Sequence, residues 1–368
     1  MSCKQFVTPN EVKGNSSYKF VLSTVTAIEK IIEGTDWNDL KDLIKLIGEH
    51  IRTASRGTKE RTWVLNICLR TLKIAREEAL KAETPNAEFE ENKTNRLFAT
   101  GDNAYENVTR NKLLDPLLSA YEEFVVDIKS CCENISDLSL EFIHADELIL
   151  TRGYSQAAYQ FLRRAGEKKR SFKVIICEGY PENMGHKLAE DLSKEGIFVI
   201  LIPDSHVFGL MSRINKVIIG CHAVFPDGTI MAPTGTFSVL LAAKRFSIPS
   251  YVCLPQYKLS PVPLQTSVTS PPPYEVIPTA SPNDSSLDWL DSPDIICPPN
   301  DPVFSDGSLK DPPSSLGPVV WAPRWEYIPA GLVSLFLTNL GSHAPSYLYA
   351  LGRELFHTLD IQNVLSSD

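Results

Sequence analysis

Hydrophobic and polar positions follow a helical pattern along the first part of the chain. Apolar residues recur every three or four positions over 18–34, 36–54 and 60–83, a spacing typical of amphipathic helices. Asp36 is placed to cap the second of these helices. Residues 84–110 are polar and predict a loop. The pattern indicates an N-terminal helical domain over residues 1–145.

A longer apolar seam ends this helical part. Its positions are separated alternately by four and three residues, which predicts one helix with a heptad pattern: Leu117, Tyr121, Phe124, Ile128, Cys131, Ile135, Leu138 and Phe142. Asp115 is placed to cap this helix, with Pro116 in its first turn. The seam packs either within its own domain or against a partner. Packing within the same domain is favoured, because amphipathic helices usually bury their apolar face against the core of their own domain.

After residue 146 the pattern changes to short apolar runs separated by helical ones. The runs lie at 147–151, 172–178, 197–203, 216–220 and 248–255, and each gap has room for one helix. Such alternation predicts a parallel sheet covered on both faces. We therefore expect an α/β protein in which the helical domain precedes a Rossmann-like, doubly wound parallel sheet domain, formed by 146–260 and 324–368. The last part should begin like a strand and continue in two helices.

A proline-rich stretch interrupts the sheet domain. Residues 261–323 hold 15 of the 26 prolines of the chain, together with many Ser and Asp. A segment of this composition buries too little apolar surface to offset the entropy lost on ordering. We expect a largely disordered insertion whose ends meet at the surface of the domain.

Charge and cysteine usage narrow the class of protein. The net charge of −9 argues against bare nucleic acid as the main partner. Neither a signal sequence nor an apolar run of membrane-spanning length is present, so no membrane partner is expected. The eight cysteines form no C-x-x-C pair, and most lie in apolar runs. This usage predicts a cytosolic protein without disulfides or structural zinc.

Ligands of a doubly wound sheet bind outside the carboxyl ends of its strands. Polar residues follow these ends at Arg152, Glu178, Asp204 and His222, and the turn from Pro233 to Thr236 opens a helix whose N–H groups suit an anion. Neither a dinucleotide fingerprint nor a P-loop is present, so no nucleotide cofactor is expected. The Asp227-Gly228 pair predicts a hairpin turn.

Cys221 and His222 have the composition of a nucleophile beside its base. Neighbouring residues at a strand end point to opposite faces, so these two side chains should not meet. A buried, unreactive cysteine is the favoured interpretation, although a pairing of Cys221 with His186 or His206 stays open. A metal site formed by the three histidines matches no usual ligand spacing.

Three stretches carry a resemblance to a known family. Residues 174–197 ("VIICEGYPENMGHKLAEDLSKEGI"), 211–261 and 327–357 resemble the alpha, beta and delta regulatory subunits of eukaryotic translation initiation factor 2B. The segment "NLGSHAPSYLY" (339–349) is similar to the beta branch in particular. The resemblance implies a fold shared with isomerases of methylthioribose 1-phosphate and ribose 1,5-bisphosphate.

The resemblance also implies that the catalytic chemistry is lost. Those isomerases use a cysteine after the first strand, an arginine after the second and an aspartate after the fourth, where this chain has Gly153, Tyr180 and His222. No catalytic residue, cofactor or metal is therefore expected. What remains is a vestigial pocket, expected from Gly153, Glu178, Tyr180, Gly185, His186, Asp204, Cys221, His222, Thr234, Gly235 and Thr236.

The function implied is that of a non-catalytic regulatory subunit of the guanine-nucleotide exchange factor for initiation factor 2. Its expected partners are the delta, gamma, epsilon and alpha subunits, together with the alpha subunit of initiation factor 2, whose phosphorylation the complex senses in the integrated stress response. An active sugar-phosphate isomerase and a metabolite-sensing relative are the alternatives. Interface candidates are Phe208, Met211, Arg213, Asn215, Lys216, Asn339, Pro345, Tyr347 and Tyr349.

Overall fold

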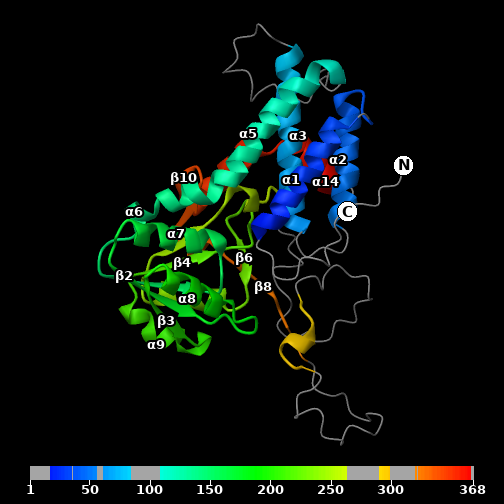
Figure 1. The fold of residues 1–368 in the computed structure, drawn as a ribbon. Helices are drawn as coiled ribbons and strands as arrows, with labels where there is room; N and C mark the ends of the chain where they lie inside the picture. The colour runs from blue at the N-terminus through cyan, green and yellow to red at the C-terminus, as the bar shows by residue number, and fades with distance from the viewer. Residues whose placement is uncertain are drawn as a thin grey trace, which may run out of the picture. The chain divides into compact units, whose positions relative to one another are not determined.

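The computed structural model describes residues 17–34, 36–55, 61–83, 108–262, 290–298, 320 and 322–365. Its contacts divide the chain into two compact units, a helical unit (1–131, 255–263 and 346–368) and a sheet unit (132–254 and 264–345). The division falls inside one long helix (Figure 1). The loop expected at 84–110 lies almost wholly outside the described residues.

The helical unit is built from amphipathic helices around an apolar core. It contains α1 (Ser17–Glu33), α2 (Leu40–Ser55), α3 (Arg61–Glu83), the first part of α5 (Arg110–Asp137), η5 (Gln256–Lys258), α13 (Leu348–Leu355) and α14 (Thr358–Leu365). Ile28, Leu43 and Leu69 are fully buried in this core. The predicted helices over 18–34 and 60–83 are confirmed, and the one over 36–54 is confirmed from Leu40 onward, because their apolar stripes are the buried faces.

The heptad seam packs within the chain, as predicted. Leu117, Tyr121 and Ile128 are buried, and the Tyr121 hydroxyl donates a hydrogen bond to the Val25 carbonyl at 2.9 Å. The start of the helix differs from the prediction, since α5 begins at Arg110 and contains Pro116. Contacts outside the helix hold its earlier start, where the Arg110 N–H donates to the Asn38 carbonyl at 2.8 Å. Tertiary anchoring therefore outweighs the hydrogen bond that a proline inside a helix removes.

Asp36, predicted to cap the second helix, does not lie at its start. Helix α2 begins at Leu40, not directly after Asp36. Trp37 is fully buried, and its indole N–H donates to the Ile32 carbonyl at 3.0 Å. Residue 39 forms a β-bridge to Thr109. These contacts hold residues 36–39 in a connection, so that the helix starts only after them.

The end of the chain belongs to the helical unit. The sequence assigned all of 324–368 to the sheet domain, whereas the contacts place 346–368 with the N-terminal helices. Side chains of α3 explain this placement. The Arg70 guanidinium donates to the Leu355 carbonyl at 2.9 Å, and the Lys73 ammonium donates to the Glu354 carbonyl. Cations on one helix thus bind the last carbonyls of another, which have no partner inside their own helix.

The sheet unit has the predicted Rossmann-like topology. Its seven strands run in the order β10-β9-β7-β4-β1-β2-β3, all parallel except β10. They are β1 (Glu147–Arg152), β2 (Phe172–Cys177), β3 (Phe198–Ile202), β4 (Lys216–Gly220), β7 (Ser250–Cys253), β9 (Leu335–Thr338) and β10 (Gly341–His343). Three of the crossovers are single helices, α7 (Gln156–Glu167), α8 (Met184–Lys194) and α10 (Thr236–Arg245) (Figure 1). The crossover from β3 to β4 consists of three short pieces, η3 (Asp204–His206), α9 (Val207–Leu210) and η4 (Met211–Arg213). A further short helix, α6 (Ser139–Phe142), precedes β1.

A small antiparallel sheet lies in the same unit. It consists of β5 (Ala223–Val224), β6 (Ile230–Pro233) and β8 (Trp325–Ile328), in that order. The predicted hairpin turn between β5 and β6 is confirmed, with Gly228 at φ 80° and the Asp227 carboxylate accepting from the Thr229 N–H at 2.9 Å. This sheet brings β8 beside the start of α10.

The segment 325–341 departs from the prediction. A strand-like start and a helix were expected, but it forms two strands, β8 and β9, joined through η9 (Ala330–Leu332). Phe336 and Leu337 are both fully buried although they point to opposite faces of β9. The periodicity of such a short apolar run fits a buried strand and a helix equally well. Its pairing with β7 shows that it is a strand.

Most of the expected disordered insertion, 261–323, lies outside the described residues. Residues 290–298 are described and contain the turn η7 (Pro293–Ile295). Leu290 forms a β-bridge with Pro323, and the Asp291 N–H donates to the Ala322 carbonyl at 2.7 Å. This piece is thereby anchored to the residues that lead into β8.

Candidate functional site

The strand order reverses between β1 and β4, and the residues after these strands form the centre of the candidate site. Arg152 ends β1 with its side chain only 4% exposed. Its guanidinium Nη2 lies 3.2 Å from Asp204 Oδ2 and 3.4 Å from the Tyr180 carbonyl oxygen. The Asp204 carboxylate also accepts from the N–H groups of Gly179 and Tyr180, at 3.3 and 2.9 Å. One ion pair thus ties together the ends of β1, β2 and β3.

The anion-binding turn predicted at the start of α10 is present, and a carboxylate of the chain fills it. Gly235 takes φ 94° as the N-cap residue. Its N–H donates to Glu326 Oε1 at 2.7 Å, and the Phe237 N–H donates to Glu326 Oε2 at 2.8 Å. Thr234 is bound by its N–H to the Arg324 carbonyl at 3.0 Å and by its hydroxyl to the Pro323 carbonyl at 2.6 Å. The turn is therefore closed by the segment that leads into β8.

A cavity of about 70 Å³ lies beside this turn. Its walls come from the ends of β1 and β2, from the turn itself and from the described piece of the insertion: Arg152, Gly179, Tyr180, Pro181, Glu182, Pro233, Thr234, Asp291, Ile295, Ile296, Ala322, Pro323, Arg324 and Trp325. Each arginine in the wall lies near a carboxylate of the chain, Arg152 near Asp204 and Arg324 near Asp291 at 3.8 Å. The positive charge of each arginine in this cavity wall is thus already balanced by a nearby carboxylate of the chain.

The predicted pocket residues divide into groups in the structure. Gly153 and Gly179 have φ 60° and 76°, and a Cβ on Gly179 would lie 3.2 Å from the Gly153 Cα. Gly185 packs on the end of β2, since its N–H donates to the Glu178 carbonyl at 2.8 Å. Tyr180 and Thr234 line the cavity, and Gly235 and Thr236 begin α10. His186 and His206 are exposed on α8 and η3.

Cys221 and His222 diverge, as predicted. Cys221 Sγ lies 3.9 Å from the Cys253 carbonyl oxygen, whereas the His222 ring packs on Trp325 with ring centroids 4.0 Å apart. Both side chains are buried. None of the seven described cysteines forms a disulfide with another described residue. Among the residues with described positions, no three His, Cys, Asp or Glu side chains come together as metal ligands.

The interface candidates include two residues that the chain itself buries. Met211 is fully buried, and Lys216 is 6% exposed because its ammonium pairs with Glu147 at 2.8 Å. These two were wrongly expected at a surface, because the local sequence reveals neither the burial of Met211 in η4 nor the ion pair of Lys216 with Glu147. Asn215 is exposed, and its Oδ1 accepts from the Leu148 N–H at 2.7 Å. Of the other candidates, Phe208, Arg213, Tyr347 and Tyr349 are exposed, and Asn339 and Pro345 are partly exposed.

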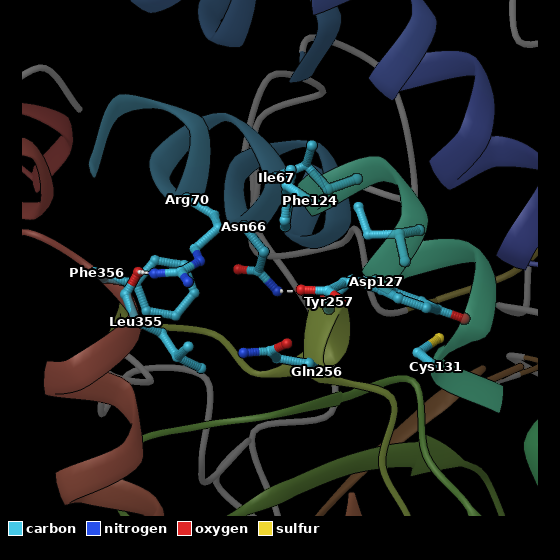
Figure 2. Close-up of a pocket in the computed structure, with 11 residues that line it drawn as sticks. Asn66, Ile67, Arg70, Phe124, Asp127, Cys131, Gln256, Tyr257, Leu355 and Phe356 are labelled. Atoms are coloured by element: carbon cyan, nitrogen blue, oxygen red, sulfur yellow. Dashed lines mark hydrogen bonds between the residues drawn. The ribbon is translucent and has the colours of Figure 1, made fainter. Parts of the chain in front are cut away.

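A second, smaller cavity of about 20 Å³ lies within the helical unit (Figure 2). The Asn66 side chain donates to the Tyr257 carbonyl at 3.0 Å, while its own Oδ1 accepts no hydrogen bond from the described residues. Arg70 turns toward Leu355, with Phe356 beside it (Figure 2). Burial lowers the pKa of the Arg70 guanidinium below its usual range. A cavity of this size and polarity suits an ordered water.

Sequence reasoning missed the residues that decide the site. Glu326 and Trp325 lie in a strand that follows the proline-rich stretch, and no local pattern links them to a turn about 90 positions earlier. Arg152 is the last residue of β1, and its place at the end of a predicted strand was the one indication of the site in the sequence. The cavity therefore depends on pairings that only the fold provides.

The doubly wound sheet and its carboxyl-edge cavity define a Rossmann-like α/β protein with an attached helical unit. The model of the initiation factor 2 subunit family matches residues 13–345. The chain belongs to the initiation factor 2 subunit family, which confirms the resemblance.

Curated relatives agree with this assignment. The chain is 35% identical to translation initiation factor eIF2B subunit beta of Dictyostelium discoideum over 250 residues, 68% of this chain and 57% of the relative. It is 35% identical to the same subunit of Schizosaccharomyces pombe over 246 residues, 66% and 56% of the two chains. The aligned part thus spans somewhat more than half the length of these relatives. A ribose 1,5-bisphosphate isomerase of Thermococcus kodakarensis is 24% identical, over 65% of this chain and 66% of the enzyme.

Solved structures show the same fold. Crystalline eIF2B beta from Chaetomium thermophilum aligns with a TM-score of 0.69 at 19% identity, covering 96% of this chain and 90% of that chain. A chain of the tetrameric eIF2B-beta2-delta2 complex from that fungus aligns with a TM-score of 0.63 at 18% identity, covering 92% and 90%. No helix in the described part of the chain combines the length and hydropathy needed to cross a membrane.

Proposed function

We propose that the chain is a non-catalytic regulatory subunit of the guanine-nucleotide exchange factor for translation initiation factor 2, in the position of the beta subunit. The observation that carries this proposal is the 35% identity to two beta subunits over about two thirds of the chain. Its role is to hold the assembly together and to help sense phosphorylation of the alpha subunit of initiation factor 2.

The geometry of the site supports the absence of catalysis. At the three positions where isomerases of this fold carry reactive groups, Gly153 has no side chain, Tyr180 is 53% exposed and His222 is buried under Trp325. A general acid or base must reach the reacting atom within about 3 Å or through one water. Gly153 and His222 are not among the residues that line the cavity next to Arg152, and Tyr180, which does line it, has a phenol where the isomerases have a guanidinium.

The delta subunit is the direct partner that we propose first, because a related fold occurs in the beta2-delta2 complex. The gamma, epsilon and alpha subunits complete the proposed assembly. The proposed contact residues include exposed aromatic residues of each unit, Phe208 of the sheet unit and Tyr347 and Tyr349 of the helical unit, which are 60%, 43% and 59% exposed. Aromatic side chains of this kind are frequent anchors of protein interfaces.

Native purification of the tagged chain from its own cells tests the proposal. We expect the delta, gamma and epsilon subunits to be recovered with it in defined ratios by mass spectrometry. An unrelated tagged cytosolic protein purified in parallel sets the background. Recovery of the chain as a monomer, with none of these subunits above background, would contradict the proposed function.

Isomerase activity is the alternative, favoured by the isomerase relative at 24% identity. The assay uses the purified chain with methylthioribose 1-phosphate and ribose 1,5-bisphosphate. Turnover that Glu178→Ala abolishes would establish the enzyme and overturn the non-catalytic assignment. We expect no turnover with either sugar phosphate.

A further inference from the structure

Residues 290–298, which we call the strap, are fastened to the residues that lead into β8. The Asp291 N–H donates to the Ala322 carbonyl at 2.7 Å, next to a β-bridge from residue 290 to Pro323. The Asp291 side chain is 13% exposed, and its carboxylate lies 3.8 Å from Arg324 Nε. These contacts all lie at the first two residues of the strap.

The strap also forms part of the wall of the cavity at the carboxyl edge of the sheet. Asp291, Ile295 and Ile296 line this cavity together with Arg152 and Tyr180. Within the strap, the Ile295 and Ile296 N–H groups donate to the carbonyls of residues 292 and 293, at 3.1 and 3.0 Å. A change that loosens this turn therefore also loosens one wall of the cavity.

Ser292 precedes the turn as its N-cap residue and has the features of a phosphate acceptor. It is exposed and is followed by Pro293, and a serine before a proline is the sequence that proline-directed protein kinases recognise. Its backbone has φ −58° and ψ 133°, close to the polyproline II conformation that is favoured before a proline. Among the residues that the structure describes, the other serine before a proline is Ser260, which is only 2% exposed. The same dipeptide is therefore accessible at Ser292 and buried at Ser260.

A phosphate on Ser292 would be placed among carboxylates. The Ser292 hydroxyl now donates to Asp294 Oδ2 at 3.0 Å and accepts from the Asp294 N–H at 3.4 Å. Phosphorylation replaces the hydroxyl hydrogen by a group with about 1.5 to 2 negative charges. Because Asp291 and Asp294 lie one and two positions away, the added charge repels both of them, and such repulsion disrupts local structure.

We propose that Ser292 is a phosphorylation site and that its phosphate releases the strap, which opens the cavity at the carboxyl edge of the sheet. A proline-directed kinase and ATP supply the group. Ser292 Oγ forms a bond to the γ-phosphorus, the bond from this phosphorus to the oxygen of the β-phosphate breaks, ADP leaves, and the hydroxyl proton passes to a base of the kinase. The inference concerns the sheet unit and does not rest on the function proposed above.

Phosphopeptide mass spectrometry tests the modification. The full-length chain is incubated with ATP, phosphatase inhibitors and an extract of the cells that produce it. We expect phosphate at Ser292 and none at Ser260, which has the same following proline but is buried. Absence of phosphate at Ser292 would overturn the proposal, and equal occupancy of the two serines would overturn the argument from exposure.

Hydrogen exchange tests the release. Full-length chains are produced with serine or with phosphoserine at position 292, and exchange is followed by mass spectrometry in peptides that cover the strap. The N–H groups of Asp291, Ile295 and Ile296 are hydrogen-bonded in the native strap. We expect them to exchange at least ~10-fold faster in the phosphorylated chain, because local opening sets the exchange rate. The acceleration should shrink at about 1 M salt, which screens the repulsion.

Two controls separate the effect of the charge from other effects. Phosphoserine at position 193 is the matched control, since Ser193 is exposed on α8 and does not line the cavity, and it should leave exchange in the strap unchanged. Ser292→Ala removes the hydrogen bonds to Asp294 without adding charge, so it should accelerate exchange much less than the phosphate does. Full acceleration by Ser292→Ala would overturn the charge argument. Unchanged or slower exchange with phosphate at position 292, as capture of the phosphate by Arg324 would cause, would overturn the release.

Discussion

The guanidinium of Arg76 and the carboxylate of Asp360 form a bidentate ion pair, although the two residues are 284 positions apart in the sequence. Arg76 Nη2 lies 2.7 Å from Oδ1, and Nε lies 2.9 Å from Oδ2. The two side chains are 2% and 1% exposed. This pair fastens the first turn of α14 to α3, and with Arg70 and Lys73 it explains why the end of the chain belongs to the helical unit.

Breaking this pair should strongly destabilise the helical unit. Asp360→Asn leaves the Arg76 charge buried without its counter-charge, which typically costs roughly 3–5 kcal/mol. Chemical unfolding followed by circular dichroism measures the loss. Glu190→Gln removes an exposed partner of Lys194 and should leave the midpoint unchanged. A loss for Asp360→Asn as small as that for Glu190→Gln would show that the pair contributes little.

Two glycines inside helices should respond in opposite directions to replacement by alanine. A Cβ on Gly185 would overlap the Cys177 carbonyl and lie 2.8 Å from the Glu178 carbonyl oxygen, so Gly185→Ala should destabilise by about 1–3 kcal/mol. Gly48 on α2 has no neighbouring atom within 4 Å of such a Cβ. Gly48→Ala should therefore stabilise by up to about 1 kcal/mol. Denaturant midpoints compare the two variants, and equal shifts would refute the packing argument.

Substitutions at Lys216 and Phe208 should separate folding from assembly. Lys216→Glu places a second carboxylate beside Glu147 in a buried position, so it should lower the Tm of the isolated chain. Phe208→Ser changes a side chain that is 60% exposed and makes one edge contact with the Phe246 ring, so it should lower the Tm only slightly and weaken association with the delta subunit.

Differential scanning fluorimetry and mass photometry provide the two readouts. Val126→Ser is the control, an equally exposed apolar residue on α5 that is not among the interface candidates. Undiminished assembly by Phe208→Ser would remove Phe208 from the interface. An unchanged Tm for Lys216→Glu would contradict the buried ion pair.

The cysteines should differ sharply in reactivity. Burial is the main cause that raises the thiol pKa of Cys177 to about 12, and burial likewise raises the pKa of Cys68 to about 12. The thiolate is the reactive form, so both should resist alkylation at pH 8 in the folded chain. Cys297 is partly exposed and should be labelled. Site-resolved mass spectrometry measures the extent of labelling at Cys297 relative to Cys177 and Cys68. Rapid labelling of Cys177 would contradict its burial.

The same two raised pKa values predict a loss of stability at alkaline pH. The unfolded thiols ionise near pH 9.0, whereas the folded ones stay protonated to about pH 12. The contribution of both thiols is therefore complete below about pH 9 and falls as the pH rises toward 12. Unfolding free energies measured from pH 8 to 11 should decline, and the decline should be smaller in Cys177→Ala. Equal slopes in the two proteins would contradict the prediction.

The sequence by itself determined the elements whose period is unambiguous. The helices over 18–34 and 60–83 and the strands before Arg152, Glu178 and Cys221 all lie where their apolar spacing indicates. A face that must be buried imposes its own period on the chain, and this holds without knowledge of the neighbours. The divergence of Cys221 and His222 follows from the same alternation along a strand.

Only the tertiary structure decided the site. Glu326 reaches the N–H groups of Gly235 and Phe237 because β8 pairs with β6, and Asp360 reaches Arg76 because α14 packs on α3. Each contact joins groups far apart in the sequence, where no local period connects them. The anion-binding turn could be predicted from its own residues. The carboxylate that fills it could not, because that side chain is placed there by strand pairing and not by closeness in the sequence.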